Sequence, residues 1–399
     1  MSKGWQTQTL GEILQRTETF NPLQFPEREF DYIDVSSISN DTFEIKETQR
    51  LKGKNAPSRA RRLVRHNDVL FATIRPTLKR IAVVPAELDH QVCSTGYFVL
   101  RPKQALNHRY LFYSLFTEGF TEAMETLQKG ASYPAVTDGE VRAQTISFPS
   151  LPEQESIVDI LDEAFDGIAT AKANAEKNLQ NARALFNSHL EAIFTRRGES
   201  WVDKRLGDIA SVKGGKRVPK GYKLLREPTD FPYLRVADFS DFGSIDMSDL
   251  RYISADVHRK IKNYVISSAD MYLSIAGTIG KTGIIAKELD GANLTENACR
   301  LVFQPGISNR FVYYFTLTTD FSEQAGLQTR TAAQPKLALS RLATITLGVP
   351  SLEIQESLAR RFDALREETL HLESIYQQKL ATLEALKKSL LHYAFSGQL

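Results

Sequence analysis

Residues 150–195 read SLPEQESIVDILDEAFDGIATAKANAEKNLQNARALFNSHLEAIFT, and a related stretch, residues 351–396, follows 201 positions later. The two stretches align without a gap, so that Gln154-Glu155-Ser156 falls on Gln355-Glu356-Ser357. In both stretches apolar residues return at steps of three and four, with one extra step of four at the centre. This spacing is typical of a helix with one apolar face. The sequence therefore predicts two long helices that each need a partner.

Each predicted helix has a suitable start. Ser150 and Ser351 are residues that cap a first turn, and Pro152 fits inside it. An unbroken helix from Glu153 to Thr195 would be about 64 Å long at ~1.5 Å per residue, which is too long to be covered by one small globule. The other copy is the natural partner, and the globule between the copies brings the chain back. We therefore expect an antiparallel coiled coil.

The duplication extends outside the helices. Trp5 followed by Leu10-Gly11 recurs as Trp201 followed by Leu206-Gly207. A repeat of roughly 200 residues suits a duplicated domain followed by a helix, with pseudo-two-fold symmetry. The segments between the repeated motifs differ in length and content, as expected of one scaffold that carries two sets of loops. We predict a first globule at residues 1–149, a first long helix at 150–198, a second globule at 199–349 and a second long helix at 350–399.

Within each globule the local pattern is mostly that of β-strands. Short β-branched and aromatic runs, such as residues 69–74 and 271–276, are bounded by turn residues. One helix is expected in each globule, over about residues 107–127 and 309–328, where aromatic residues recur near helical spacing. The expected fold class is α+β, with a twisted antiparallel sheet in each globule.

The composition is that of a soluble protein of two to three domains. Of 399 residues, 42% are apolar and 25% are charged, and the formal net charge of +2 does not by itself identify a nucleic-acid partner. The chain begins without an apolar signal segment, and no run approaches the ~18 apolar residues that would cross a membrane. We expect a cytoplasmic protein without membrane contact. Cys93 and Cys299 stand alone, which favours neither a disulfide nor a zinc site.

Sequence patterns for catalysis are weak. Residues 277–282 resemble the end of a phosphate-binding loop, but its first glycine is replaced by Ile275. No His-x-x-x-His pair or methyltransferase cofactor motif occurs. Asp31 or Asp34 with Glu44 could form a metal-dependent nuclease set, although a half-exposed strand explains the same pattern. We predict no catalytic residue and no metal site, and keep two alternatives: a stand-alone nuclease, and a coiled-coil adaptor without DNA contact.

Basic and glycine-rich loops favour DNA contact. Arginine forks suit phosphate oxygens and guanine edges, and glycine lets backbone amides approach a phosphate. A further loop before each long helix carries short polar side chains that could reach base edges, although a tight turn is an equally good explanation of those loops. The candidate DNA-binding residues are Arg59, Arg61, Arg62, Arg75, Lys79, Arg80, Ser132 and Tyr133 in the first globule, and Lys213, Lys216, Arg217, Lys220, Tyr222, Thr278, Lys281, Gln334 and Lys336 in the second.

In this order, and present twice, the motifs resemble the specificity subunits of type I DNA restriction-modification enzymes. The resemblance covers the whole chain. It rests on the Trp-x(4)-Leu-Gly-x-Ile openings, the Pro-Ser-Leu-Pro-Glu-Gln sequence before the first long helix, the Gly-Thr-Ile-Gly-Lys-Thr-Gly turn at 277–283, the Ala-Ala-Gln-Pro-Lys loop at 332–336, and the terminal residues 394–399.

The resemblance implies a non-catalytic subunit in which two α/β target recognition domains each read one half of a split DNA sequence. Two antiparallel helices act as a ruler between them. The implied partners are double-stranded DNA and two modification subunits, which methylate adenine with S-adenosylmethionine that they bind themselves; this chain would hold no cofactor. In restriction complexes two motor-nuclease subunits bind outside these. The first globule departs from the second at residues 75–79 and 130–135, so no individual base contact is carried over to it.

Overall fold

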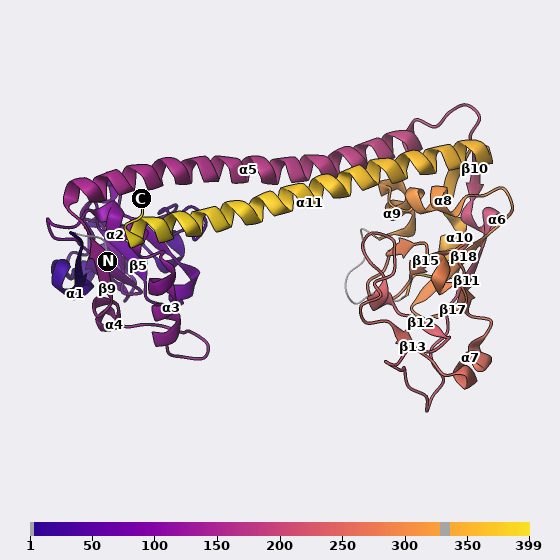
Figure 1. Cartoon of the computed structure of the whole chain (residues 1–399), viewed down its shortest axis with the longest axis horizontal. Coiled ribbons are helices and arrows are strands. Elements are labelled where there is room, and N and C mark those ends of the chain that lie inside the picture. Colours follow the sequence, from indigo (N-terminus) through magenta and orange to yellow (C-terminus); the bar gives the residue numbers. More distant parts are fainter. Residues whose placement is uncertain (1–3, 328–335) are drawn as a thin grey trace. The chain divides into compact units, whose positions relative to one another are not determined.

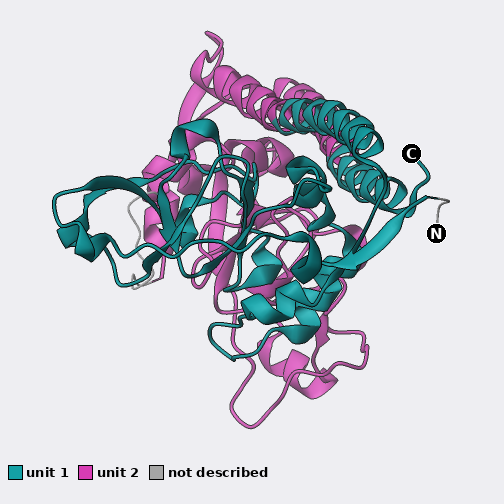
Figure 2. Cartoon of the chain, turned by 90° about the vertical axis from the view of Figure 1, so that its left-hand side faces the viewer, with its two compact units in different colours: residues 1–176, 377–399 teal, residues 177–376 magenta. Residues whose placement is uncertain are grey.

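The computed structural model describes residues 4–327 and 336–399, which fall into two compact units. The first unit comprises residues 1–176 and 377–399, and the second comprises residues 177–376 (Figure 2). Each unit contains one globule, one end of the first long helix and the opposite end of the second. Each unit is therefore assembled from both copies of the repeat.

Both predicted long helices are present (Figure 1). Helix α5 spans Leu151–Thr195 and helix α11 spans Leu352–Ser396, each with 45 residues. Their apolar faces join the cores of the units: Leu161 and Leu391 are buried in the first, and Leu190 and Phe362 in the second. No helix in the described ranges is both long enough and apolar enough to span a membrane.

Ion pairs within each unit fix the relative direction of the two helices. In the first unit, Nζ of Lys172 on α5 lies 3.4 Å from Oε1 of Glu384 on α11. In the second unit, Nη2 of Arg183 on α5 lies 2.9 Å from Oε2 of Glu373 on α11. Arg183 comes eleven residues after Lys172, whereas Glu373 comes eleven residues before Glu384. The helices therefore run in opposite directions, and the predicted antiparallel pairing is confirmed.

A buried glutamine fastens the start of α5 to the first globule. The Gln154 side chain is fully buried. Its Oε1 accepts a hydrogen bond from the backbone N–H of Asn107 at 2.8 Å, and its Nε2 donates to the carbonyls of Ala105 at 3.0 Å and Pro149 at 2.9 Å. One side chain thus joins the helix, the strand end before it and the loop that leads into helix α2 (His108–Ser114).

Gln355 makes the same contacts at the start of α11. Its Oε1 accepts from the backbone N–H of Ser308 at 2.9 Å, and its Nε2 donates to the carbonyls of Gly306 at 3.2 Å and Pro350 at 2.9 Å. The identity of Gln154 and Gln355 in the two repeats therefore has a structural cause: each buried side-chain amide satisfies three backbone groups where the long helix leaves its globule.

A second contact between helix and globule is also duplicated. Two turns further along each long helix, a carboxylate is held by an arginine and a tyrosine from the globule: Asp162 by Arg109 and Tyr113, and Asp363 by Arg310 and Tyr314.

The globule of the first unit, recognition domain 1, contains three small sheets. Their strand orders are β3-β2-β7-β4, β6-β5-β8 and β1-β9. The strands are β1 Gln6–Thr9, β2 Glu29–Ile33, β3 Gln49–Lys52, β4 Ala60–Leu63, β5 Val69–Ala72, β6 Ile81–Val83, β7 Val92–Ser94, β8 Tyr97–Leu100 and β9 Thr145–Phe148. The helices are α1 Leu10–Ile13, α2 His108–Ser114, α3 Glu118–Leu127 and α4 Asp138–Arg142.

The globule of the second unit, recognition domain 2, repeats this plan. Its strand orders are β13-β12-β17-β14, β11-β18-β15-β16 and β10-β19. The strands are β10 Val202–Arg205, β11 Ala210–Gly214, β12 Pro232–Leu234, β13 Arg251–Tyr252, β14 Val265–Ile266, β15 Met271–Ser274, β16 Thr282–Gly283, β17 Ala292–Leu294, β18 Ala298–Phe303 and β19 Thr346–Val349. The helices are α6 Leu206–Ile209, α7 Ala255–Ile261, α8 Asn309–Phe315, α9 Thr319–Ala325 and α10 Leu339–Thr344.

Two details of the predicted globules are wrong. Each globule has several sheets instead of one antiparallel sheet, and one pairing in each, β2 with β7 and β12 with β17, is parallel. The single predicted helix of each globule is two helices. At the break, the hydroxyls of Thr117 and Thr318 donate to the carbonyls of Ser114 at 2.8 Å and Phe315 at 2.7 Å. A threonine hydroxyl that bonds to a nearby backbone carbonyl competes with the helix at that point.

Replacing Gln154 with Leu is expected to weaken recognition domain 1. The change removes the partner of one N–H and one carbonyl at part-buried positions and of the buried carbonyl of Pro149, at about 1–3 kcal/mol for the buried group. Urea denaturation followed by tryptophan fluorescence should show an earlier transition, with a loss of stability of at least ~2 kcal/mol. Gln180→Leu, at an exposed position of the same helix, should leave the transition unchanged; an equal loss in both variants would contradict the assigned role.

Exchanging the charges of Arg183 and Glu373 tests the helix pairing. Arg183→Glu alone places two carboxylates together and Glu373→Arg alone places two guanidinium groups together, so each should lower the melting temperature of the chain. The double exchange restores opposite charges and should recover most of the loss. If the double variant melts no higher than the worse single variant, these two side chains do not face each other in solution.

Candidate nucleic-acid interface

In each recognition domain, the loop after a central strand lies beside the loop that precedes the last short helix. In domain 1 the backbone N–H of Val136 donates to the carbonyl of Thr73 at 2.9 Å, and in domain 2 that of Leu337 donates to the carbonyl of Ile275 at 2.9 Å. The two hydrogen bonds occupy equivalent places in the repeat. Two candidate loops that are far apart in sequence are therefore joined in both domains.

Arg75, Ser132 and Tyr133 of domain 1 form one group. The backbone N–H of Arg75 donates to the carbonyl of Pro134 at 2.7 Å, and its Nη2 donates to the carbonyl of Ser132 at 3.3 Å. The guanidinium carbon lies 5.1 Å from the centroid of the Tyr133 ring. Tyr133 is 71% exposed, so an aromatic ring and a guanidinium group are presented together at the surface.

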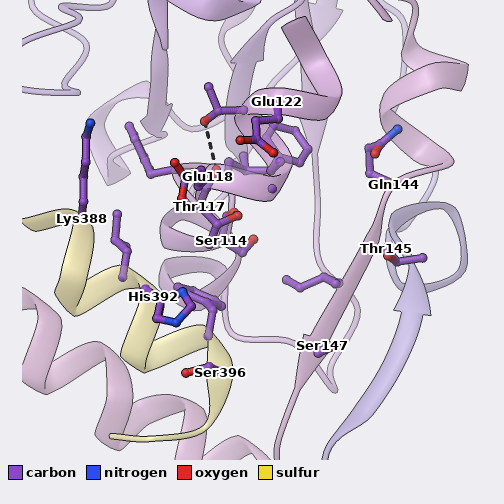
Figure 3. A pocket seen from close by; sticks show the side chains of 18 of the residues that line it. Ser114, Thr117, Glu118, Glu122, Gln144, Thr145, Ser147, Lys388, His392 and Ser396 are labelled. Carbon is purple, nitrogen blue, oxygen red and sulfur yellow. Dashed lines mark hydrogen bonds between the residues drawn. The ribbon is translucent and has the colours of Figure 1, made fainter. Parts of the chain in front are cut away.

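Lys79 lies at the edge of a cavity of about 860 Å³ in the first unit. The cavity is lined by α3, by β9 and by the last turns of α11, from which Lys388 and His392 extend (Figure 3). Burial and the neighbouring Lys388 ammonium lower the pKa of Lys79, while Glu118 acts in the opposite direction. Two lysines from distant segments thus line one cavity together with carboxylates of α3.

The remaining candidate arginines of domain 1 differ in how strongly the protein holds them. Arg59 is exposed. The other three donate to protein oxygens: Arg61 to the carbonyl of Ala60 at 2.8 Å, Arg62 to the carboxylate of Asp138 at 2.7 Å, and Arg80 to the carbonyl of Val35 at 2.8 Å. The guanidinium groups of Arg62 and Arg80 thus tie distant segments of the domain together.

Glu296 brings together two candidate loops of domain 2. Its Oε1 lies 2.5 Å from Nε of Arg217, and its backbone carbonyl accepts from Nζ of Lys336 at 2.7 Å. Burial raises the pKa of Glu296, but the hydrogen bonds that it accepts, chiefly from Arg217, lower it below the ordinary value. Lys216 lies close by, with its ammonium 5.7 Å from the centroid of the Tyr264 ring. Glu296 therefore joins Arg217 through its carboxylate and Lys336 through its backbone carbonyl.

Tyr222 lies in a second polar cluster of domain 2. Its hydroxyl donates to Asp256 Oδ2 at 2.8 Å and accepts from Lys260, whose ammonium lies 4.3 Å from the ring centroid. The Tyr222 hydrogen bond is the largest cause of the lowered pKa of Asp256. Tyr222 also lines a cavity of about 390 Å³ together with Arg217 and Arg235.

The other candidates of domain 2 do not join these clusters in the same way. Lys213, Lys220 and Thr278 are exposed. Lys281 is held by the protein, because its ammonium lies 3.0 Å from a carboxylate oxygen of Asp241 and donates to the carbonyl of Phe239 at 2.8 Å. Gln334 lies outside the described residues.

The structure adds three basic residues that sequence reasoning missed. Lys388 joins Lys79, Lys260 joins Tyr222, and Arg235 lines the cavity of Arg217. Each is remote in sequence from the loop that it joins, and Lys260 and Lys388 belong to helices. The sequence signal for the candidates was a run of basic residues in a loop, and these three residues do not lie in such runs.

The alternative nuclease set is not assembled. Asp31 accepts a hydrogen bond from Arg50 at 2.8 Å, and Asp34 accepts from the hydroxyls of Tyr32 and Ser36 at 3.2 Å each. Across the two described ranges, no group of three or more histidine, cysteine, aspartate or glutamate side chains could hold a metal ion.

Both cysteines are buried and have free thiols. Burial raises the pKa of Cys299 to about 12 and also raises the pKa of Cys93. A thiol that stays protonated and buried is a poor nucleophile and a poor metal ligand.

Two domains of one plan, each joined to the start of one long helix and the end of the other, form a duplicated architecture. The family model of the type I restriction modification DNA specificity domain matches residues 2–180 and again residues 198–385. The chain belongs to this family, and it is a specificity subunit of a type I restriction-modification system.

Several known proteins are similar to the chain over most of its length. The EcoBI specificity subunit of Escherichia coli is 22% identical, covering 79% of this chain and 70% of that protein. The MjaVIII specificity subunit of Methanocaldococcus jannaschii is 23% identical, covering 77% and 73%. These alignments cross both recognition domains, as the duplicated plan requires.

Solved structures also agree with the fold. A chain from a study of complex assembly and conformational transition in a type I R-M system superimposes with a TM-score of 0.86, at 26% identity, over 100% of this chain and 99% of that one. The HsdS subunit of Thermoanaerobacter tengcongensis gives a TM-score of 0.66, also at 26% identity, over 99% and 97%.

Arg59→Gln and Arg62→Gln should have different effects. Arg62 loses its hydrogen bond to Asp138, so thermal unfolding should begin at a lower temperature, whereas Arg59 is exposed and its loss should leave the melting temperature unchanged. Differential scanning calorimetry measures both. Equal melting temperatures for the two variants would show that the Arg62 contact does not stabilise the domain.

Proposed function

We propose that each recognition domain reads one half of a split DNA target through its joined pair of loops, while α5 and α11 set the distance between the halves. The observation that supports this most directly is the repeated hydrogen bond that joins the two loops, Val136 to Thr73 and Leu337 to Ile275. The same framework occurs twice, so one mode of DNA contact serves both domains. Half-sites about one helical turn, ~34 Å, apart suit two such readers.

Unlike side chains on the equivalent loops account for unlike half-sites. Domain 1 presents Arg75 stacked beside Tyr133, and domain 2 presents Arg217 and Lys336 around Glu296. A guanidinium group suits guanine edges and phosphate oxygens, whereas a carboxylate accepts from cytosine and repels a phosphate. The group of Arg75 and Tyr133 therefore favours contact with phosphate oxygens or with guanine. The group around Glu296 fits a position where the DNA presents a hydrogen-bond donor, as cytosine does.

The exposed basic residues contact phosphates and fix the register on the duplex. Arg59, Lys213, Lys220 and Lys216 are exposed, and the ammonium groups of the three lysines carry charge without a base-specific shape, as expected of residues that contribute affinity more than selectivity.

In the assembled complex, two modification subunits bind this chain and methylate adenine with S-adenosylmethionine that they hold themselves. Two motor-nuclease subunits join the complex when it also cuts DNA. The chain itself supplies sequence recognition and geometry, and the complex acts in the cytoplasm, where the chromosome lies.

Removing Arg75 and Tyr133 should weaken binding of the target duplex. Arg75→Ala and Tyr133→Ala are each expected to raise the Kd about tenfold, which is ~1.4 kcal/mol, and Arg75→Ala should also lower the slope of log K against log salt by about 0.9 if it neutralises one phosphate. Fluorescence anisotropy at several salt concentrations separates the two effects. Glu44→Gln, at an exposed carboxylate outside both loops, serves as the control. Wild-type chain that binds no duplex at low salt would contradict the proposed function.

Exchanging residues 1–149 for the same domain of a relative should change one half of the methylated sequence and leave the other half unchanged. The reason is that the loops of each domain are joined within that domain. Co-expression with the modification subunit, followed by mapping of methylated adenines, provides the measurement. A change in both halves would contradict independent reading by the two domains.

A further inference from the structure

Glu296 lies in a segment of recognition domain 2 that is bonded to two of the candidate DNA-binding loops at once. On one side, the backbone N–H of Lys216 donates to the carbonyl of Leu294 at 2.8 Å. On the other side, the N–H of Ile275, at the start of the turn that carries Thr278, donates to the carbonyl of Asn297 at 2.7 Å. The position of Glu296 between these loops is therefore fixed by backbone contacts on both sides.

The approach of the first loop is close enough to require a glycine. A Cβ atom at position 215 would lie 2.0 Å from the carbonyl oxygen of Thr295 and 2.4 Å from that of Leu294. A residue with a side chain could not be placed there without a shift of the backbone. This contact brings Arg217, two residues after Gly215, beside the carboxylate of Glu296, where its Nε lies 2.5 Å from Oε1.

The carboxylate of Glu296 keeps capacity for a further hydrogen bond. Its Oε1 accepts from Arg217, and its Oε2 accepts from the hydroxyl of Thr295 at 3.0 Å. A carboxylate offers about four acceptor positions, and 21% of the Glu296 side chain is exposed. Glu296 can therefore accept from a donor that approaches the domain from outside.

Arg217 presents the rest of its guanidinium group to solvent. The bond to Glu296 uses Nε, and 78% of the Arg217 side chain is exposed. The two terminal nitrogens of an arginine form a fork of donors that suits two neighbouring acceptors. A group that only accepts and a group that only donates thus lie side by side on one surface.

A cytosine–guanine pair matches this arrangement. In the major groove cytosine presents its N4 amino donor, and guanine presents two acceptors, O6 and N7. Adenine also presents an amino donor, but its N7 acceptor lies beside that donor and would face the carboxylate, and thymine presents the acceptor O4. A carboxylate next to an arginine fork therefore fits cytosine on one strand and guanine on the other better than it fits an adenine–thymine pair.

Recognition domain 1 has neither member of the pair. The equivalent parallel pairings of β7 and β17 align the two domains at this place. After the shift of 201 positions, Thr95 stands where Glu296 does, and after the shift of 196 positions that relates the two tryptophan openings, Asn21 stands where Arg217 does. The acid and the arginine are thus particular to domain 2, as expected of residues that distinguish one half-site from the other.

We propose that Arg217 and Glu296 together read one cytosine–guanine pair in the half-site of domain 2. Glu296 accepts from the N4 amino group of cytosine, and Arg217, held in place by Glu296, donates to O6 and N7 of the paired guanine. The inference rests on the proposed function and adds the base pair and the residues that select it. The half-site of domain 1 carries no such requirement through the equivalent residues.

The test uses the full chain co-expressed with its modification subunit. Mapping of methylated adenines gives the split target sequence, and exchange of residues 1–149 shows which half belongs to domain 2. The wild-type complex is expected to require a cytosine–guanine pair at one position of that half. In competition binding with four duplexes that differ only at this position, it should prefer the cytosine–guanine duplex about tenfold.

Glu296→Gln separates base reading from the positioning of Arg217. The glutamine carbonyl oxygen can still accept from Nε of Arg217, but its amide group also donates, which suits N6 and N7 of adenine. This variant should lose the preference for cytosine and accept adenine on that strand, with every other position of the target unchanged. Glu288→Gln, at an exposed carboxylate of the same domain, is the matched control and should retain the wild-type target.

Arg217→Lys tests the second half of the pair. Lysine keeps the positive charge and lacks the fork, so the preference for the cytosine–guanine duplex should fall about fivefold while the dependence of binding on salt stays the same. Thermal melting of all variants verifies that each is folded.

The failure of this inference can be distinguished from the failure of the proposed function. A half-site of domain 2 without a fixed cytosine–guanine pair overturns the inference. A Glu296→Gln or Arg217→Lys variant that binds all four duplexes less tightly by the same factor, with its preference unchanged, also overturns it, because the residue then supports the fold or contacts a phosphate. In these cases the wild-type chain still directs methylation to a split sequence, and the proposed function stands. A wild-type chain that binds no duplex removes both.

Discussion

The structure depends on the burial of one glutamine at the start of each long helix. The buried amides of Gln154 and Gln355 each bond to three backbone groups, and one of these, the carbonyl of Pro149 or Pro350, is bonded at a buried position. A hydrogen-bonded amide at a buried position tolerates little change in angle or distance. Because the helices that follow these loops, α2 and α8, hold Asp162 and Asp363 through arginine and tyrosine, each long helix leaves its globule in a fixed direction. The position of the loops relative to the helix within each unit follows from that attachment.

Much of this architecture could be predicted from the sequence because a long helix repeats its apolar spacing over many residues. The repeat at 150–195 and 351–396 gave the two helices, and the antiparallel arrangement followed from chain connectivity. The sheets were harder to predict. Their strands are short, and the pairing of β2 with β7 joins segments about sixty residues apart. No local pattern shows that a threonine such as Thr117 will turn its hydroxyl to a carbonyl and divide a helix.

The candidate interface was predictable only in part, for a related reason. Arg59, Arg62 and Arg80 look alike in the sequence, yet Arg62 reaches Asp138 and Arg80 reaches Val35, both distant in the chain. Conversely, Lys388 belongs to a helix and meets Lys79 only because the end of α11 returns to the first unit. Charge in a sequence identifies the groups that could meet a phosphate, and the fold decides which of them are left to do so.

The ion pairs between the long helices bear on the history of the duplication. Lys172 of the first copy corresponds to Glu373 of the second, and Arg183 corresponds to Glu384. An ancestral half-length chain pairing antiparallel with itself would place residue 172 against residue 183, which here are both cations; the second copy would oppose two anions. The two halves are therefore complementary to each other and not to themselves, and these charges favour pairing of unlike halves within one chain over pairing of like halves.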